Sequence, residues 1–150
     1  MAVPHELLLL DQYELPEMAK RCQVSFDFSS ARDPDYLARV CPYVTYAFFS
    51  GSHMTQGGDR GADGSLPRAR HEVVGVTLGS GGSIFSEEGK RYHPGIVPVE
   101  AIDTMGAGDS FIAGFLTRRI WVTAWRTRFA LRTAAANTCK FHGGWLSASA

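Results

Sequence analysis

Two short strand-like runs separated by a helix-like segment restrict the fold of this chain more than any other feature. Residues 24–28 alternate apolar with small or polar side chains, and residues 44–49 are rich in β-branched and aromatic side chains. Between them, residues 34–40 fit a short helix with Asp33 as its cap. Because parallel strands need a crossover, usually a helix, this order predicts a β-α-β unit with two parallel strands.

Further strands and turns follow this unit. Residues 73–78 form a continuous run of the kind found in buried parallel strands, and glycines within 79–82 predict a turn into a strand at 83–86. Residues 87–90 are typical of a hairpin tip. We therefore predict an α/β fold, a three-layer sandwich with a mainly parallel central sheet, helices on both faces and the ligand at the carboxyl ends of the strands.

The other segments are predicted from periodicity and length. Residues 6–21 indicate helical turns, a later helix is expected to begin near Asp109, and a last one to run from about 125 to 140. Residues 50–71 hold five glycines and no periodic apolar face, so we interpret them as a long irregular loop. With 150 residues, 45% of them hydrophobic, the chain suffices for one folded domain spanning 1–150.

The charge balance favours neither nucleic acid nor an anionic membrane as a partner. The formal net charge is zero, but residues 110–150 carry six basic and no acidic side chains. Trp121 and Trp125 lie among these arginines, so a nucleic-acid arm is an alternative interpretation. We expect this stretch to face solvent or phosphate instead, and predict no nucleic-acid partner.

Cysteine usage and hydropathy predict a cytoplasmic protein. The three cysteines are widely spaced and odd in number, which favours reduced thiols over a disulfide framework. Apolar runs fall short of the ~20 residues that span a bilayer, and the N-terminus lacks the order of a signal peptide. We therefore expect no membrane association.

The turn from Gly106 to Asp109 is the most informative chemical feature. Small residues at a junction between a loop and a helix let backbone N–H groups converge on an anion, and the helix dipole reinforces them. Asp109, in the first helical turn, would place a potential general base beside that anion. This pairing suits phosphoryl transfer. The alternative is a glycine-rich loop whose aspartate only caps the helix.

The longer pattern around this turn is more specific. From Asp103 to Phe115 the sequence reads Asp-Thr-Met-Gly-Ala-Gly-Asp-Ser-Phe-Ile-Ala-Gly-Phe. It resembles, without a gap, the C-terminal signature of the ribokinase-like, or phosphofructokinase-B type, carbohydrate kinases. The runs 25–29 and 139–145 resemble in particular the fructoselysine 6-kinase branch of that family.

The resemblance implies catalytic roles for the turn. Asp109 would be the base that takes the proton from the sugar hydroxyl. The backbone amides of Gly106, Ala107 and Gly108 would form the anion hole for the transferred phosphoryl group. Sugar and ATP are then the expected small-molecule partners, with Mg²⁺ accompanying the phosphates.

The resemblance also implies two binding sites for cofactors. Thr77, Gly79 and Gly82 match the strand and turn against which ATP lies, although a strand followed by glycines is by itself more often a plain turn. A monovalent cation such as K⁺ would lie behind the anion hole, held by Asp103 and carbonyls near Gly143. The alternative for Asp103 is a turn residue that caps the loop.

Two segments depart from the family pattern. Where the family has an Asn-x-x-Glu type sequence that organises magnesium and phosphates, this chain has Ser50 and His53, and the glycine-rich loop replaces the helix that normally follows. Residues 118–126 are more basic than in similar chains. Both segments weaken the expectation of an unaltered kinase site.

Length is the larger departure, because kinases of this family are about twice as long. Their N-terminal half supplies most of the sugar-binding residues and a β lid, so the resemblance implies a ribokinase-like fold truncated at its N-terminal side. The expected function is ATP-dependent phosphorylation of a sugar hydroxyl, fructoselysine or a related carbohydrate. The alternative is a non-catalytic nucleotide-binding fragment. Self-association through the surface left by the missing half is a further expectation.

Overall fold

The computed structural model describes residues 14–31, 33–51, 71–87, 89–93 and 96–121, with 118–121 described by their backbone alone. Most of the predicted loop at 50–71, the predicted last helix at 125–140 and Gly143 lie outside these residues. The chain divides into two compact units, Met1–Leu78 with Ile84–Tyr92, and Gly79–Ser83 with His93–Ala150.

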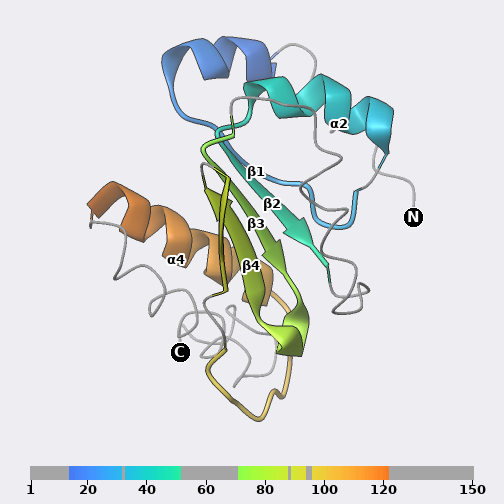
Figure 1. The fold of residues 1–150 in the computed structure, drawn as a ribbon, viewed down its shortest axis with the longest axis vertical. Helices are drawn as coiled ribbons and strands as arrows, with labels where there is room; N and C mark the ends of the chain where they lie inside the picture. The colour runs from blue at the N-terminus through green and yellow to red at the C-terminus, as the bar shows by residue number, and fades with distance from the viewer. Residues whose placement is uncertain (1–13, 32, 52–70, 88, 94–95, 122–150) are drawn as a thin grey trace. The chain divides into compact units, whose positions relative to one another are not determined.

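The described elements follow the predicted order, beginning with helical turns at 14–21. After this helical segment, the elements are β1 (Ser25–Asp27), α2 (Pro34–Val40), the 3₁₀ turn η1 (Cys41–Tyr43), β2 (Tyr46–Ser50), β3 (Val73–Thr77), the 3₁₀ turn η2 (Gly79–Gly81), β4 (Ser83–Glu87), β5 (Lys90–Tyr92) and α4 (Ala107–Trp121). The strands form one sheet in the order β1-β2-β3-β4-β5. Figure 1 shows β2 and β3 running side by side toward the same end.

The first three strands confirm the predicted β-α-β unit. β1 pairs with β2 in parallel, with Phe26 opposite Ala47, and β2 pairs with β3 in parallel, with Ala47 opposite Val74. The predicted parallel arrangement is confirmed for β1, β2 and β3, but β4 and β5 form an antiparallel hairpin, so the sheet as a whole is mixed. The short connection 78–82 between β3 and β4 leaves no room for the crossover that a parallel strand needs.

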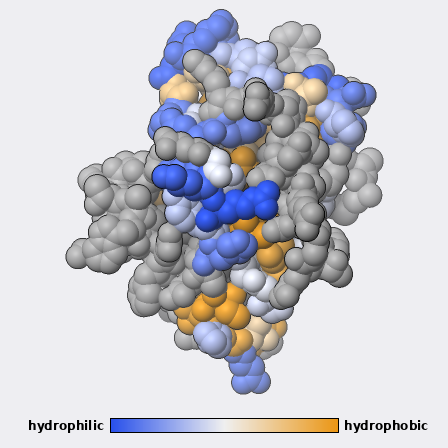
Figure 2. All heavy atoms as spheres, viewed as in Figure 1, coloured by the Kyte–Doolittle hydropathy of each residue, from blue (hydrophilic) through white to orange (hydrophobic). Residues whose placement is uncertain are grey.

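One face of the sheet packs against the two N-terminal helices. Alternation along β2 puts Ala47 and Phe49 on this face, where they join one apolar cluster with side chains of both helices. The buried members of the cluster are Leu15, Val24, Phe28, Tyr36, Leu37, Val40, Cys41, Val44, Ala47, Phe49, Val74 and Val76. In Figure 2 the surface at the upper end of the view, where these helices lie, is largely hydrophilic, as expected for amphipathic helices.

Aromatic side chains strengthen this cluster. The rings of Phe28 and Phe49 stack with centroids 4.7 Å apart and an interplanar angle of 6°, and Phe28 meets Tyr36 edge-on at 6.2 Å. Phe26 packs at 4.8 Å from Phe28. Such pairs add to the free energy of burial, so these aromatic residues belong to the core rather than to a platform for stacking bases.

The opposite side of the sheet is closely packed around Gly75. A Cβ atom at Gly75 would lie 2.9 Å from Cδ1 of Phe48 and 3.0 Å from Cε1 of Phe85. Phe48 is 2% exposed and Phe85 6%. The glycine in the middle of β3 is therefore required by the two rings on the neighbouring strands.

The start of α2 depends on the predicted cap. Asp33 Oδ1 accepts hydrogen bonds from the amides of Asp35, at 2.9 Å, and Tyr36, at 3.4 Å, and proline occupies the first helical turn. Replacing Asp33 by alanine leaves these amides to water and is expected to lower the free energy of unfolding by about 1 kcal/mol, measured by urea denaturation. Asp33→Asn keeps an acceptor oxygen and should cost much less. An equal loss in both variants would contradict the capping role.

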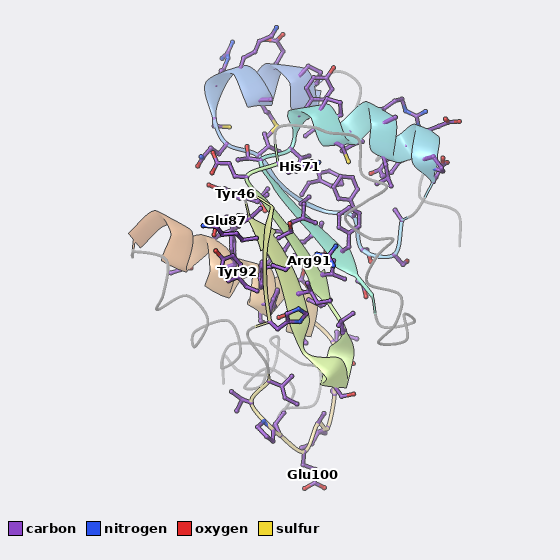
Figure 3. All side chains as sticks on the ribbon, in the orientation of Figure 1. Tyr46, His71, Glu87, Arg91, Tyr92 and Glu100 are labelled. Carbon is purple, nitrogen blue, oxygen red and sulfur yellow. The ribbon has the colours of Figure 1, made fainter. Side chains whose placement is uncertain are left out.

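His71 is held at the amino-terminal end of the central strands (Figure 3). Its Nδ1 lies 2.9 Å from the carbonyl oxygen of Val44, and since a carbonyl only accepts, Nδ1 carries the hydrogen. Nε2 is buried and has no hydrogen-bond partner among the described residues. Burial lowers the pKa of His71 below its ordinary 6.5, and the hydrogen bond to Val44 opposes this effect in part.

This lowered pKa predicts a loss of stability in mild acid. As the pH falls below 6.5, the unfolded chain takes up a proton at His71 that the folded chain does not, so the free energy of unfolding decreases. His71→Asn keeps a side-chain N–H donor but does not titrate, and its unfolding free energy should fall less between about pH 7.5 and 5. Urea denaturation over this range measures both slopes. Parallel slopes for wild type and variant would exclude the effect.

Candidate active site

The residues before α4 form a tight turn that fixes the start of the helix. Gly106 has φ +73°, a conformation that glycine adopts without strain. The Met105 amide donates to Asp103 Oδ1 at 2.9 Å, and the Ala107 amide donates to the Thr104 carbonyl at 3.1 Å. The helix begins at Ala107, two residues before the predicted start near Asp109.

The helix start presents backbone donors to an anion. The first bond of the helical ladder runs from the Ser110 amide to the Gly106 carbonyl, at 2.9 Å. The amides of Gly108 and Asp109 precede it and have no hydrogen-bond acceptor among the described residues, as usual at a helix N-terminus. Among the described residues, no atom lies within 4 Å of a Cβ built at Gly108, so they leave the space beside this turn open. An anionic phosphate group fits this arrangement.

The predicted anion-hole residues differ in whether their backbone amides already donate a hydrogen bond. The Ala107 amide already donates within the turn, whereas the amides of Gly106 and Gly108 have no acceptor among the described residues. Asp109 is exposed in the first helical turn, where the helix dipole favours a carboxylate. The turn therefore places an accessible proton acceptor beside backbone donors.

Asp103 caps the turn, which was the alternative interpretation of this residue, because its Oδ1 accepts a hydrogen bond from the Met105 amide. Its predicted cation partner near Gly143 lies outside the described residues. Within those residues, no group of three or more His, Cys, Asp and Glu side chains could hold a metal ion. A cation site at Asp103 stays a prediction.

The predicted nucleotide segment lies at the end of β3. Thr77 Oγ1 donates to the Phe49 carbonyl at 3.4 Å. Gly79 and Gly82 have φ +58° and +90°, and the Gly82 amide donates to the Gly79 carbonyl at 3.1 Å. Both glycines are thus required by the left-handed backbone of this turn, which leaves the turn free of side chains at these two positions.

Two further groups at the carboxyl ends of the parallel strands were missed by the sequence analysis. Ser29 has φ +51°, unusual for a residue with a side chain; its amide donates to Asp27 Oδ1 at 2.7 Å and its carbonyl accepts from the Ser50 amide at 2.6 Å. Gly51 donates its amide to the Thr77 carbonyl at 2.7 Å. Their places within two residues of the ends of parallel strands are the signal that could have indicated them, because ligands of α/β sheets bind at this edge.

The segment before α4 also exposes large apolar side chains. Ile96, Ile102 and Met105 are 45%, 54% and 58% exposed. Hydrophobic surface is visible toward the lower end of the view in Figure 2. Self-association through the surface left by the missing half stays a prediction.

The described thiols have opposite environments. Cys22 is exposed, whereas Cys41, the first residue of η1, is buried in the apolar cluster. Burial raises the pKa of Cys41 to about 11, with its own backbone hydrogen bond acting in the opposite direction. A thiol in this environment stays protonated at neutral pH and is a poor nucleophile, so Cys41 has a packing role.

Comparison with known families identifies the class of protein. A family model described as the pfkB family of carbohydrate kinases matches residues 59–142, more than half of the chain. The matched region contains the turn before α4, Asp109 and the glycine turn after β3. The chain belongs to the pfkB family of carbohydrate kinases.

Two curated relatives are similar over most of the chain. The fructosamine kinase FrlD of Bacillus subtilis is 44% identical over 94% of this chain and 52% of its own length. The fructoselysine 6-kinase of Escherichia coli is 34% identical over 81% of this chain and 46% of its own length. The chain thus spans about half the length of these relatives.

The fold agrees with solved structures of this class. A microbiome-derived acarbose kinase, Mak1, superimposes with a TM-score of 0.73 at 24% sequence identity, covering 88% of this chain and 47% of that structure. The likeness shows a ribokinase-like α/β fold. In the segments that the structure describes, no helix has the length and apolar character needed to span a membrane.

Proposed function

We propose that this chain is the nucleotide-binding and phosphoryl-transfer portion of an ATP-dependent kinase that acts on a fructosamine-type sugar. The observation that carries the proposal is the turn from Asp103 to Asp109, in which an exposed carboxylate lies at a helix start with open backbone donors. Similarity to a fructosamine kinase and a fructoselysine 6-kinase supports the acceptor class.

The chemistry follows from the residues of the turn. Asp109 accepts the proton of the acceptor hydroxyl while the oxygen of that hydroxyl forms a bond to the γ-phosphorus of ATP. The bond between that phosphorus and the β,γ-bridging oxygen breaks, and ADP leaves. Amides of Gly106 and Gly108 stabilise the charge on the phosphoryl oxygens, and the Ala107 amide joins them by sharing its hydrogen with the Thr104 carbonyl.

The remaining roles complete the proposed site. The nucleotide lies against Thr77, Gly79 and Gly82. The two glycines have a left-handed backbone and no side chain, so the backbone can approach the nucleotide closely. Bound Mg²⁺ would neutralise phosphate charge. Asp103 and the carbonyls near Gly143 would hold a monovalent cation such as K⁺. Helices on both faces of the sheet would give the three-layer arrangement of the family.

The test is release of ADP by the full chain with ATP, Mg²⁺ and fructoselysine, with fructose and ribose as alternative acceptors. The proposal predicts turnover that depends on the acceptor and is highest with fructoselysine. ATP binding without turnover on any sugar would favour a non-catalytic nucleotide-binding fragment.

A further inference from the structure

Gly51 lies where two strand ends approach too closely for a side chain. It is buried and directly follows β2. A Cβ at this position would lie 2.9 Å from Leu78 Cδ2, 2.9 Å from Val76 Cγ1 and 3.3 Å from the Thr77 carbonyl oxygen. Gly51 does not adopt a left-handed φ. A side chain at this position is therefore opposed by lack of space and not by the backbone conformation.

The contacts of Gly51 converge on the end of β3. Its amide donates to the Thr77 carbonyl at 2.7 Å, while the Thr77 hydroxyl donates to the Phe49 carbonyl at 3.4 Å. Thr77 is therefore held through both its backbone and its side chain by the end of β2. Leu78, whose side chain would meet the added Cβ, is the last residue before the turn at Gly79.

We infer that Gly51 is a positioning residue for the nucleotide segment. By letting β2 approach β3, it sets the position of Thr77 and Leu78, the last residues before Gly79. This inference rests on the proposed function, in which Thr77, Gly79 and Gly82 bind ATP. Gly51 acts through these residues and needs no contact with the nucleotide.

Gly75 provides a matched control for this inference. Its Cβ would also lie 2.9 Å from a neighbouring atom, but that atom is Phe48 Cδ1 in the middle of the sheet. Gly51→Ala and Gly75→Ala therefore introduce the same methyl group with a similar overlap. Only the first displaces the residues that lead into the nucleotide turn.

The experiment measures ATP binding by calorimetry, thermal unfolding, and amide hydrogen exchange for the full chain and both variants. Gly51→Ala is expected to weaken ATP binding about tenfold and to speed exchange of the Gly82 amide. Gly75→Ala should lower the unfolding temperature at least as much, yet leave the affinity for ATP within about twofold of wild type. Equal loss of affinity in both variants, or none in Gly51→Ala, would overturn the inference.

Two further comparisons keep the outcome decisive. Leu78→Ala removes one of the two side-chain atoms that the new Cβ would meet at 2.9 Å, while Val76 Cγ1 remains, so Gly51→Ala should weaken ATP binding less in the Leu78→Ala background than in wild type. A double variant that binds no better than Gly51→Ala would contradict positioning through Leu78. If wild type binds no ATP, the proposed function fails, but the exchange rates still test the role of Gly51. Faster exchange of the Gly82 amide in Gly51→Ala, but not in Gly75→Ala, supports that role. Equal exchange rates in the two variants overturn it.

Discussion

Replacing Asp109 by asparagine is expected to lower the rate of ADP formation at saturating ATP and sugar by about two to four orders of magnitude. The amide has nearly the shape of the carboxylate and can still accept hydrogen bonds at the helix start, but it cannot take the proton of the acceptor hydroxyl. Since Asp109 is exposed in the first turn of α4, its replacement leaves the buried Phe111 and Phe115 in place. Initial rates of ADP release measure the effect.

The matched control for this prediction is Asp35→Asn. Asp35 is also an exposed carboxylate in the first turn of a helix, α2, so its replacement changes the same charge near the same kind of helix end. We expect wild-type turnover for Asp35→Asn, and ATP affinity within a few-fold of wild type for both variants. Wild-type turnover by Asp109→Asn would reduce Asp109 to a helix-stabilising residue and exclude it as the base.

The parts of the fold that the sequence predicted are those set by neighbours along the chain. The helix Pro34–Val40 was predicted residue for residue because its cap, its proline and its apolar spacing all lie within one short segment. The parallel pairing of β1 with β2 followed from the helix between them. The tip of the antiparallel hairpin β4–β5 was predicted from local residues. That this hairpin makes the sheet mixed was not predicted.

The features that escaped prediction depend on residues far apart in the sequence. The close approach of Gly51 to Val76 and Leu78, and of Gly75 to Phe48, exists only once the strands have paired. The hydrogen bond from the Ala107 amide to the Thr104 carbonyl is local, but it follows from the turn geometry, which the motif alone does not specify. The motif indicated Asp109 and its glycines because the chemistry of an anion-binding turn is carried by consecutive residues.

Phe48→Ala is expected to cause the largest loss of stability among core substitutions, about 3–5 kcal/mol in the free energy of unfolding. Phe48 is one of the largest fully buried side chains of the described residues, and its ring lies beside Gly75 in the middle of the sheet. Total stabilities are about 5–15 kcal/mol, so the variant would retain a small margin. Urea denaturation followed by circular dichroism measures the change, and a loss below about 1 kcal/mol would contradict close packing here.

Combining this substitution with Gly75→Ala tests the packing itself. Alone, the added methyl at Gly75 overlaps Phe48 Cδ1 and is expected to cost about 1–3 kcal/mol. With Phe48 replaced by alanine the cost should shrink but not vanish, because Phe85 Cε1 remains 3.0 Å from the new Cβ. Phe49, which alternates to the other face of β2, is the control: Phe49→Ala and Gly75→Ala should be additive. Additivity of Phe48→Ala with Gly75→Ala would show that the ring does not set the requirement for glycine.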